Sequence, residues 1–142
     1  MAEGLAKQAL AQLKGVPIDR LEEAGIRVRS AGIMAGGESP ATAQAIEAMN
    51  KVGVDISGHS SRALTADLIQ DADAIYTMTD SHRQAVLVHS PLAAEKTQPL
   101  DPAGDIIDPI GAPAEVYIQT SEMIREALAK RLAERFGDQV KA

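Results

Sequence analysis

Three aspartates gather in one polar stretch of this 142-residue chain, the segment "LDPAGDIIDPIG". Asp101 and Asp105 are typical of a solvated acidic loop. Asp108 differs because Ile106 and Ile107 should pull its segment against the body, while the proline after it restricts its backbone to extended conformations. A carboxylate held in this way could protonate a leaving group as a general acid. Asp-Pro is also a common opener of turns, so the spacing alone leaves both interpretations open.

Other acids and histidines give weaker signals. Asp71 and Asp73 in "DADAIYT" resemble the D-x-D nucleophile of metal-dependent aspartate phosphatases, but they precede the predicted strand when that chemistry needs them after it. His59, His82 and His89 do not share the spacing of metal ligands. The sequence therefore predicts no metal site and no cofactor.

Composition limits the class of protein. The chain has 14 Lys and Arg against 20 Asp and Glu, a net charge of −6, which argues against a nucleic-acid surface and an anionic membrane surface. No stretch approaches the roughly 18 apolar residues of a membrane helix. The N-terminus lacks the basic region of a signal peptide, so a cytoplasmic location is expected. There is no cysteine, which excludes disulfides and thiolate chemistry within these residues.

The elements that must position Asp108 follow from hydrophobic periodicity and capping residues. Strands alternate with helices, which predicts an α/β protein with a parallel sheet. The predicted helices are Met1–Lys14, one opened by Ser39-Pro40 and ended by Gly53, a short one capped by Thr65, one capped by Ser81, and Val116–Phe136. The predicted strands are Arg27–Gly32, Ala72–Thr79 and the brief "KTQPL".

An ordered set of segments resembles the low-molecular-weight protein-tyrosine-phosphatase family, including its bacterial arginine-phosphatase branch. Each segment alone is weak, but together they span nearly the whole chain in family order. They are "MAEGL", "RSAG", "SPATAQAIEAM", "GVDISGHSSRALT", "DADAIYTMTDSH" and "DIIDPIG...VYIQTSEMI".

The resemblance implies a three-layer sandwich, with a small parallel sheet flanked by helices, that hydrolyses protein phosphomonoesters or phosphoarginine without metal. A cysteine thiolate attacks phosphorus, and loop amides with an arginine hold the phosphate at a helix N-terminus. Asp108 matches the acid that protonates the leaving group. Ser30 and His59 match residues that support the phosphate loop, although both positions also suit a purely structural role.

The resemblance also implies a departure. In the family the central first strand and the cysteine loop precede the residues that match "MAEGL", and here that match begins at Met1. We therefore expect residues 1–142 to form a single phosphatase-like domain that is N-terminally truncated, with the central first strand missing. This chain is predicted to be inactive as given and only marginally stable.

Three explanations of the truncation remain open. The start could be misplaced, or the sequence could be a fragment of an active enzyme. The chain could instead be a non-catalytic binding module that pairs its exposed edges with another chain or self-associates. It could also be half of a split phosphatase completed by a strand-donating partner. A receiver-like module around Asp80 is a fourth class, but no second acid follows the Arg27–Gly32 strand.

The substrate expected of the complete enzyme is a phosphorylated protein. Tyrosine-specific members place aromatic residues just after the Asp-Pro pair, where Ile110 and Gly111 stand here. The Gly-rich loop Met34–Gly37 offers no aromatic residue either. "DPIG" therefore favours phosphoarginine over phosphotyrosine, because a cleft without rings lacks the aromatic contacts that a phenyl phosphate gains.

Overall fold

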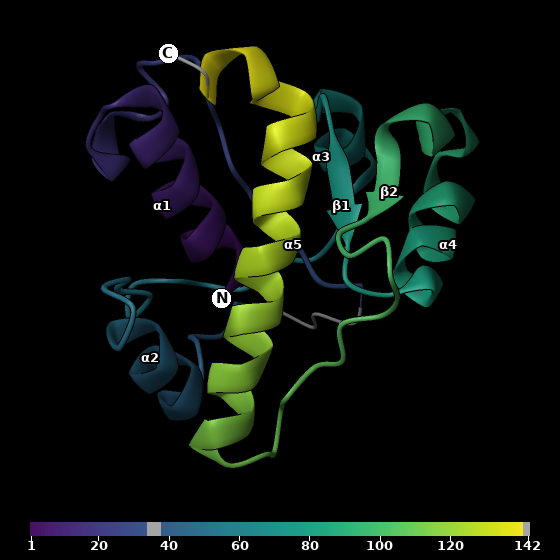
Figure 1. Ribbon diagram of the computed structural model, residues 1–142. Coiled ribbons are helices and arrows are strands. Elements are labelled where there is room, and N and C mark those ends of the chain that lie inside the picture. The colour runs from purple at the N-terminus through teal and green to yellow at the C-terminus, as the bar shows by residue number, and fades with distance from the viewer. Residues whose placement is uncertain (34–37, 141–142) are drawn as a thin grey trace.

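The computed structural model describes residues 1–33 and 38–140, and it forms an α/β fold in three layers (Figure 1). The central layer is a parallel pair of strands, β1 (Ile75–Thr77) and β2 (Thr97–Pro99), with Ile75 opposite Thr97. The predicted fold class is therefore confirmed. The Gly-rich loop Met34–Gly37 lies outside the described residues.

Helices cover both faces of the strand pair. Tyr76 and Met78 pack into the larger hydrophobic cluster, whereas Ile75 packs into a smaller one on the opposite face. The larger cluster is built by α1 (Ala2–Lys14), α2 (Ala43–Asn50) and α5 (Ala114–Val140). The smaller cluster is built by α3 (Ala66–Asp71), α4 (Asp80–His89) and the 3-10 helix η2 (Pro91–Lys96), and a second 3-10 helix, η1 (Ile18–Arg20), follows α1.

Helix α1 confirms the first predicted helix and its end. Leu5 and Leu10 are both buried, Leu5 in the larger hydrophobic cluster and Leu10 in a separate cluster with Ala11 and Leu21. Gly15 follows the helix in the left-handed conformation, with φ of 68°, and its N–H donates to the carbonyls of Ala11 and Gln12. Glycine adopts this conformation without the steric cost that a Cβ atom brings, so Gly15 ends the helix.

Two predicted helix caps are wrong. Thr42, not Ser39, caps α2, with its Oγ1 accepting from Ala45 N at 3.2 Å. Ser39 is occupied elsewhere, because its N–H donates to Ser61 Oγ and its carbonyl accepts from Ser61 N. Thr79, not Ser81, caps α4, because Thr79 is the last extended residue before that helix. The predicted cap of α3, Thr65, is confirmed by the bond from Leu68 N.

The strand predictions were partly wrong. "KTQPL" contains β2, but the predicted strand Ala72–Thr79 shortens to β1 because α3 and α4 use its two ends. The predicted strand Arg27–Gly32 is extended, yet only Gly32 forms a bridge, with Ala63, among the described residues. Extended backbone becomes a strand only when a neighbour supplies the hydrogen bonds, and sequence does not name that neighbour.

Helix α5 holds the strand pair to the larger cluster. It packs against both α1 and α2, and Tyr117, Ile124 and Leu128 are buried on its inner face. Arg131 is also buried, and its Nε donates at 3.1 Å to the carbonyls of Pro99 and Leu100 at the end of β2. The helix begins at Ala114, two residues earlier than predicted, and Phe136 interrupts its regular geometry near the predicted end.

Candidate functional site

Asp108 lies exposed on a loop that is anchored on both sides. Ile106 is buried and its N–H donates to Met78 O at 2.8 Å, which ties the loop to the end of β1. Pro109 is buried on the other side. Asp108 Oδ1 accepts from Ile110 N at 3.1 Å. The Asp108 backbone is thus held from both sides while its carboxyl group faces solvent.

The other two acids of the stretch have local structural contacts. Asp105 Oδ1 accepts from Asp80 N at 2.9 Å and so joins the loop to the first turn of α4. Asp101 Oδ1 accepts from Ala103 N at 2.9 Å and closes a turn. These contacts account for Asp101 and Asp105 without a chemical role.

The first turn of α1 lies within electrostatic range of Asp108. Burial lowers the pKa of the Met1 amino group, and the negative charges of Glu3 and Asp108 act in the opposite direction. The carboxylate therefore lies near the positive end of the helix dipole, at which backbone N–H groups point out of the helix.

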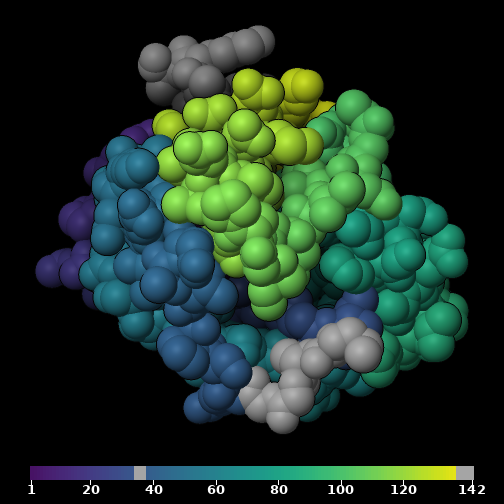
Figure 2. Space-filling view, turned by 90° about the horizontal axis from the view of Figure 1, so that it is seen from below, coloured from purple at the N-terminus to yellow at the C-terminus, as the bar shows by residue number. Residues whose placement is uncertain are grey.

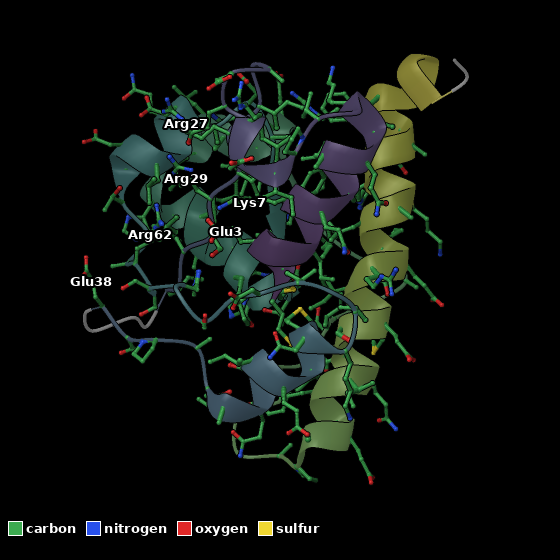
Figure 3. The ribbon with its side chains drawn as sticks, turned by 90° about the vertical axis from the view of Figure 1, so that its left-hand side faces the viewer. Glu3, Lys7, Arg27, Arg29, Glu38 and Arg62 are labelled. Carbon is green, nitrogen blue, oxygen red and sulfur yellow. The ribbon has the colours of Figure 1, made fainter. Side chains whose placement is uncertain are left out.

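Glu3 brings together the two other predicted site residues. Its side chain is 9% exposed; Oε1 accepts from Ser30 N at 3.2 Å, and Oε2 lies 3.0 Å from His59 Nδ1. Figure 3 shows Glu3 on the first turn of α1 with its carboxylate toward these neighbouring segments. Ser30 and His59, 29 residues apart in the chain, thus meet at one carboxylate. The contact of Ser30 is through its backbone N–H.

Close packing fixes the same turn of α1 from the other side. A Cβ atom on Gly4 would lie 2.9 Å from both Val54 Cγ1 and Ile56 Cγ2, closer than carbon atoms approach. Both neighbours are buried and β-branched, so neither side chain can rotate away easily. Glycine at this position therefore lets the start of α1 pack directly on the segment that leads to His59.

The surface is hollowed beside this site. Figure 2 shows a hollow between α2, the green atoms of the loop before α5 and the dark blue atoms of residues near position 30.

Within residues 1–33 and 38–140, no group of three or more His, Asp or Glu side chains could hold a metal ion. No helix in that part of the chain is long and apolar enough to cross a membrane.

A family model described as low molecular weight phosphotyrosine protein phosphatase matches residues 1–142. The chain belongs to this family. Among its relatives, the protein-arginine-phosphatase of Bacillus subtilis (strain 168) is 31% identical over 133 residues, which cover 90% of this chain and 82% of that protein. The resemblance inferred from the ordered sequence segments is therefore confirmed.

Solved structures of low-molecular-weight phosphatases share the fold. A low molecular weight protein tyrosine phosphatase from T. tengcongensis matches with a TM-score of 0.80 at 29% identity, covering 94% of this chain and 88% of that one. The YwlE arginine phosphatase from Geobacillus stearothermophilus matches with a TM-score of 0.79 at 29% identity, covering 97% and 84%. These matches support the α/β assignment.

In this family member, sequence reasoning missed Glu3. Glu3 precedes Leu10 by seven residues, or two helical turns, so periodicity places it on the buried face of α1. A carboxylate on a buried face needs hydrogen-bond or charged partners, so the position of Glu3 in the sequence could have indicated that it has a structural role. The catalytic role of Asp108 and the loop-supporting roles of Ser30 and His59 stay predictions.

Proposed function

We propose that this chain supplies the general acid, Asp108, of a protein phosphatase that works through a phosphocysteine. The observation that supports this most is the position of Asp108, exposed on a loop that the buried residues Ile106 and Pro109 anchor. A helix N-terminus favours phosphate oxygens, and a proton donor beside it would meet the leaving group. Membership of the phosphatase family supports the same reaction class.

The reaction has two displacements. A thiolate attacks phosphorus, and the bond to the leaving oxygen or nitrogen breaks as Asp108 transfers its proton to that atom. The Asp108 carboxylate then takes a proton from water as the water oxygen attacks phosphorus, and the P–S electrons return to sulfur. We assign Glu3, Ser30 and His59 the task of holding the segments around the phosphate in place.

The nucleophile has to come from outside these 142 residues, because they contain no cysteine. We propose that an N-terminal extension or a second chain supplies the cysteine loop and the central strand. On this proposal residues 1–142 fold as a single domain that is truncated relative to the complete phosphatase, and they turn over no substrate alone.

The deciding experiment is the intact mass, with N-terminal peptide mapping, of the protein purified from its own cell. We expect a mass larger by a strand and a loop, with a cysteine in the N-terminal peptide. In that longer protein Asp108→Asn should reduce turnover by about 10²–10⁴-fold, the usual contribution of a general acid. Asp105→Asn is the matched control and should leave most of the turnover. Hydrolysis by the 142 residues alone, unchanged by Asp108→Asn, would overturn the proposal.

A binding module or split phosphatase is the second candidate, and the open sheet supports it. β1 pairs only with β2, and the extended segment 26–31 forms no ladder among the described residues. A strand donated by a partner, or by a second copy, would satisfy these backbone groups. A natural mass that begins at Met1, together with a complex in sedimentation experiments, would favour this candidate.

Phosphoarginine is the substrate that we propose for the complete enzyme. Ile107 and Ile110 stand on either side of Asp108 in the sequence and are 77% and 70% exposed, so aliphatic residues and no aromatic ring adjoin the acid on its loop. The relative in Bacillus subtilis carries the name protein-arginine-phosphatase. The complete enzyme should hydrolyse a phosphoarginine peptide at least about tenfold faster than the matching phosphotyrosine peptide, a difference of about 1.4 kcal/mol. The reverse preference would assign it to the tyrosine branch.

A further inference from the structure

Four cations share one face of the molecule, on segments that adjoin Glu3, Ser30 and His59. Figure 3 shows Arg27, Arg29 and Arg62 one below another on this face, with Lys7 of α1 beside them. The whole chain carries a net charge of −6, so a cluster of positive side chains runs against its overall charge. We refer to these four residues as the arginine face.

One carboxylate of the chain itself, that of Glu22, lies close to several of these cations. Glu22 Oε1 lies 2.9 Å from Arg29 Nη2 and 3.9 Å from Arg27 Nε. The hydrogen bond and charge of Arg29, followed by the charges of Arg27 and Lys7, hold the pKa of Glu22 below its ordinary value. Three positive side chains therefore converge on one acid, which leaves an excess of positive charge.

Among the described residues, none of these four cations forms a salt bridge with an acid other than Glu22. Glu3 is buried and is already engaged by His59 and Ser30. Figure 3 shows Glu38 apart from the arginines, toward one end of the face. The side chain of Arg27 remains 69% exposed and that of Arg29 remains 37% exposed. The guanidinium groups are thus accessible to another molecule.

The backbone beneath the arginine face is extended and open. Ile26 and Val28 pack on the cluster under α1, so the alternate residues Arg27 and Arg29 project from the opposite side. Among the described residues, the backbone N–H groups of residues 27–29 have no hydrogen-bond partner. Because the central strand proposed above would use these backbone groups, the inference rests on the arginine side chains alone.

We propose that the arginine face binds an extended, acidic segment of a partner protein. Guanidinium groups bind carboxylates through paired hydrogen bonds, so each arginine selects an acidic side chain. Alternate residues of an extended chain lie about 6.6 Å apart, so Arg27 and Arg29 match acidic residues spaced two apart in the partner. Arg62 and Lys7 extend the attraction beyond this pair. The inference concerns binding only and does not depend on the phosphatase reaction.

The test is fluorescence anisotropy of the 142-residue chain with a labelled peptide of alternating Glu and Val or Thr residues. We expect saturable binding that weakens as salt is added. A peptide of the same composition with its Glu residues in one block should bind several-fold more weakly. Equal affinity for the two peptides would overturn the proposed alternating match.

Substitutions locate the binding on the molecule. Arg27→Gln with Arg29→Gln should weaken binding of the alternating peptide by at least about tenfold. The matched control, Arg125→Gln with Lys130→Gln, removes the same charge from exposed positions of α5 and should change affinity less than about twofold. An equal loss of peptide affinity in the two double variants would show that only the overall charge matters, and it would overturn the assignment of the binding site to the arginine face.

A gain of binding makes the test independent of folding defects. Glu22→Gln removes the neighbouring carboxylate that competes with the peptide for the arginines, so this change should tighten peptide binding by several-fold. A damaged fold would not produce this result. Unchanged or weaker binding by Glu22→Gln, in a variant with the circular dichroism spectrum of the original chain, would contradict the proposal.

Discussion

Glu3 accepts a hydrogen bond from Ser30 N and contacts His59 Nδ1 while only 9% of it is exposed. A single carboxylate in the first turn of α1 therefore orders two segments that are distant in sequence. Buried polar groups are costly to leave without partners, so these contacts are mutually dependent. The start of α1 is fixed by this carboxylate on one side and by Gly4 on the other.

Removing the Glu3 carboxylate should lower the stability of the fold as well as release the segments that it holds. Glu3→Ala leaves Ser30 N–H and His59 Nδ1 without their partner, so we expect a loss of about 2–3 kcal/mol in the free energy of unfolding. Glu115→Ala is the control, because Glu115 is also an acid in the first turn of a helix but is exposed. Its loss should stay below about 0.5 kcal/mol. Urea titrations of both variants measure the difference, and equal losses would show that Glu3 acts only on its helix.

The sequence allowed part of the site to be predicted. The anchoring of the Asp108 loop was predicted in part: Ile106 is buried as expected, but Ile107 is 77% exposed, and the second anchor is the buried Pro109. The catalytic role of Asp108 stays a prediction. The meeting of Ser30 with His59 at Glu3 could not be derived from the residues themselves, since it depends on contacts between segments 27 and 56 residues away from Glu3. A resemblance to a family suggested Ser30 and His59 separately, and the structure adds the residue that joins them.

Lys96 connects the end of η2 to the end of α3. Its Nζ donates to Ile69 O at 2.6 Å and Ala72 O at 2.7 Å, with a longer contact to Gln70 O. The last carbonyls of a helix have no partner within the helix and carry partial negative charge. A six-residue helix such as α3 gains little from its own hydrogen bonds, so this ammonium group is a main support.

Replacing the ammonium group of Lys96 tests whether it stabilises helix α3. Lys96→Met keeps the aliphatic stem and removes the charge, and we expect a loss of about 2 kcal/mol in the free energy of unfolding. Lys51→Met is the control, because Lys51 also stands at the end of a helix, α2, but is exposed. Thermal melts of the two variants should differ by several degrees. A matching shift in both would mean that the Lys96 contacts contribute nothing specific.

Element prediction from sequence was accurate where the signal was local. Gly15 and Thr65 were identified because turn and cap chemistry involves only nearby backbone. Thr42 was missed because Ser39 has a similar capping preference, and its pairing with Ser61 is not visible in the sequence. Thr79 was missed because β1 ends at Thr77, two residues before the predicted strand end, so α4 begins at Asp80. The segment at Arg27–Gly32 was predicted as a strand because alternation describes an extended chain and not its partner.

The whole molecule divides into unequal hydrophobic clusters. The larger one buries twelve of the described residues between α1, α2, α5 and the strands, whereas the cluster under α3 and α4 buries Ile69, Val86 and Ala93. Hydrophobic stabilisation scales with the apolar area removed from water, so the layer of α3 and α4 is the more weakly held. Thr77 adds to this, because its buried Oγ1 has no hydrogen-bond partner among the described residues.

Hydrogen exchange should reveal this inequality. Amides of α4 should exchange through a local opening, with protection at least about tenfold lower than amides on the buried face of α5. Tenfold corresponds to about 1.4 kcal/mol in the opening free energy. Equal protection in α4 and α5 would show instead that the two clusters unfold as one unit, and native-state exchange followed by NMR distinguishes these outcomes.

The contact between Arg131 and the strands has an optical consequence. The chain has no tryptophan, so its intrinsic fluorescence comes from two tyrosines, Tyr76 and Tyr117. Tyr117 is buried on α5, and the guanidinium carbon of Arg131 lies 5.9 Å from the centre of the Tyr76 ring. Both fluorophores therefore sense the docking of α5. Tyrosine emission will follow the release of that helix from the sheet and will be nearly silent when α3 and α4 detach.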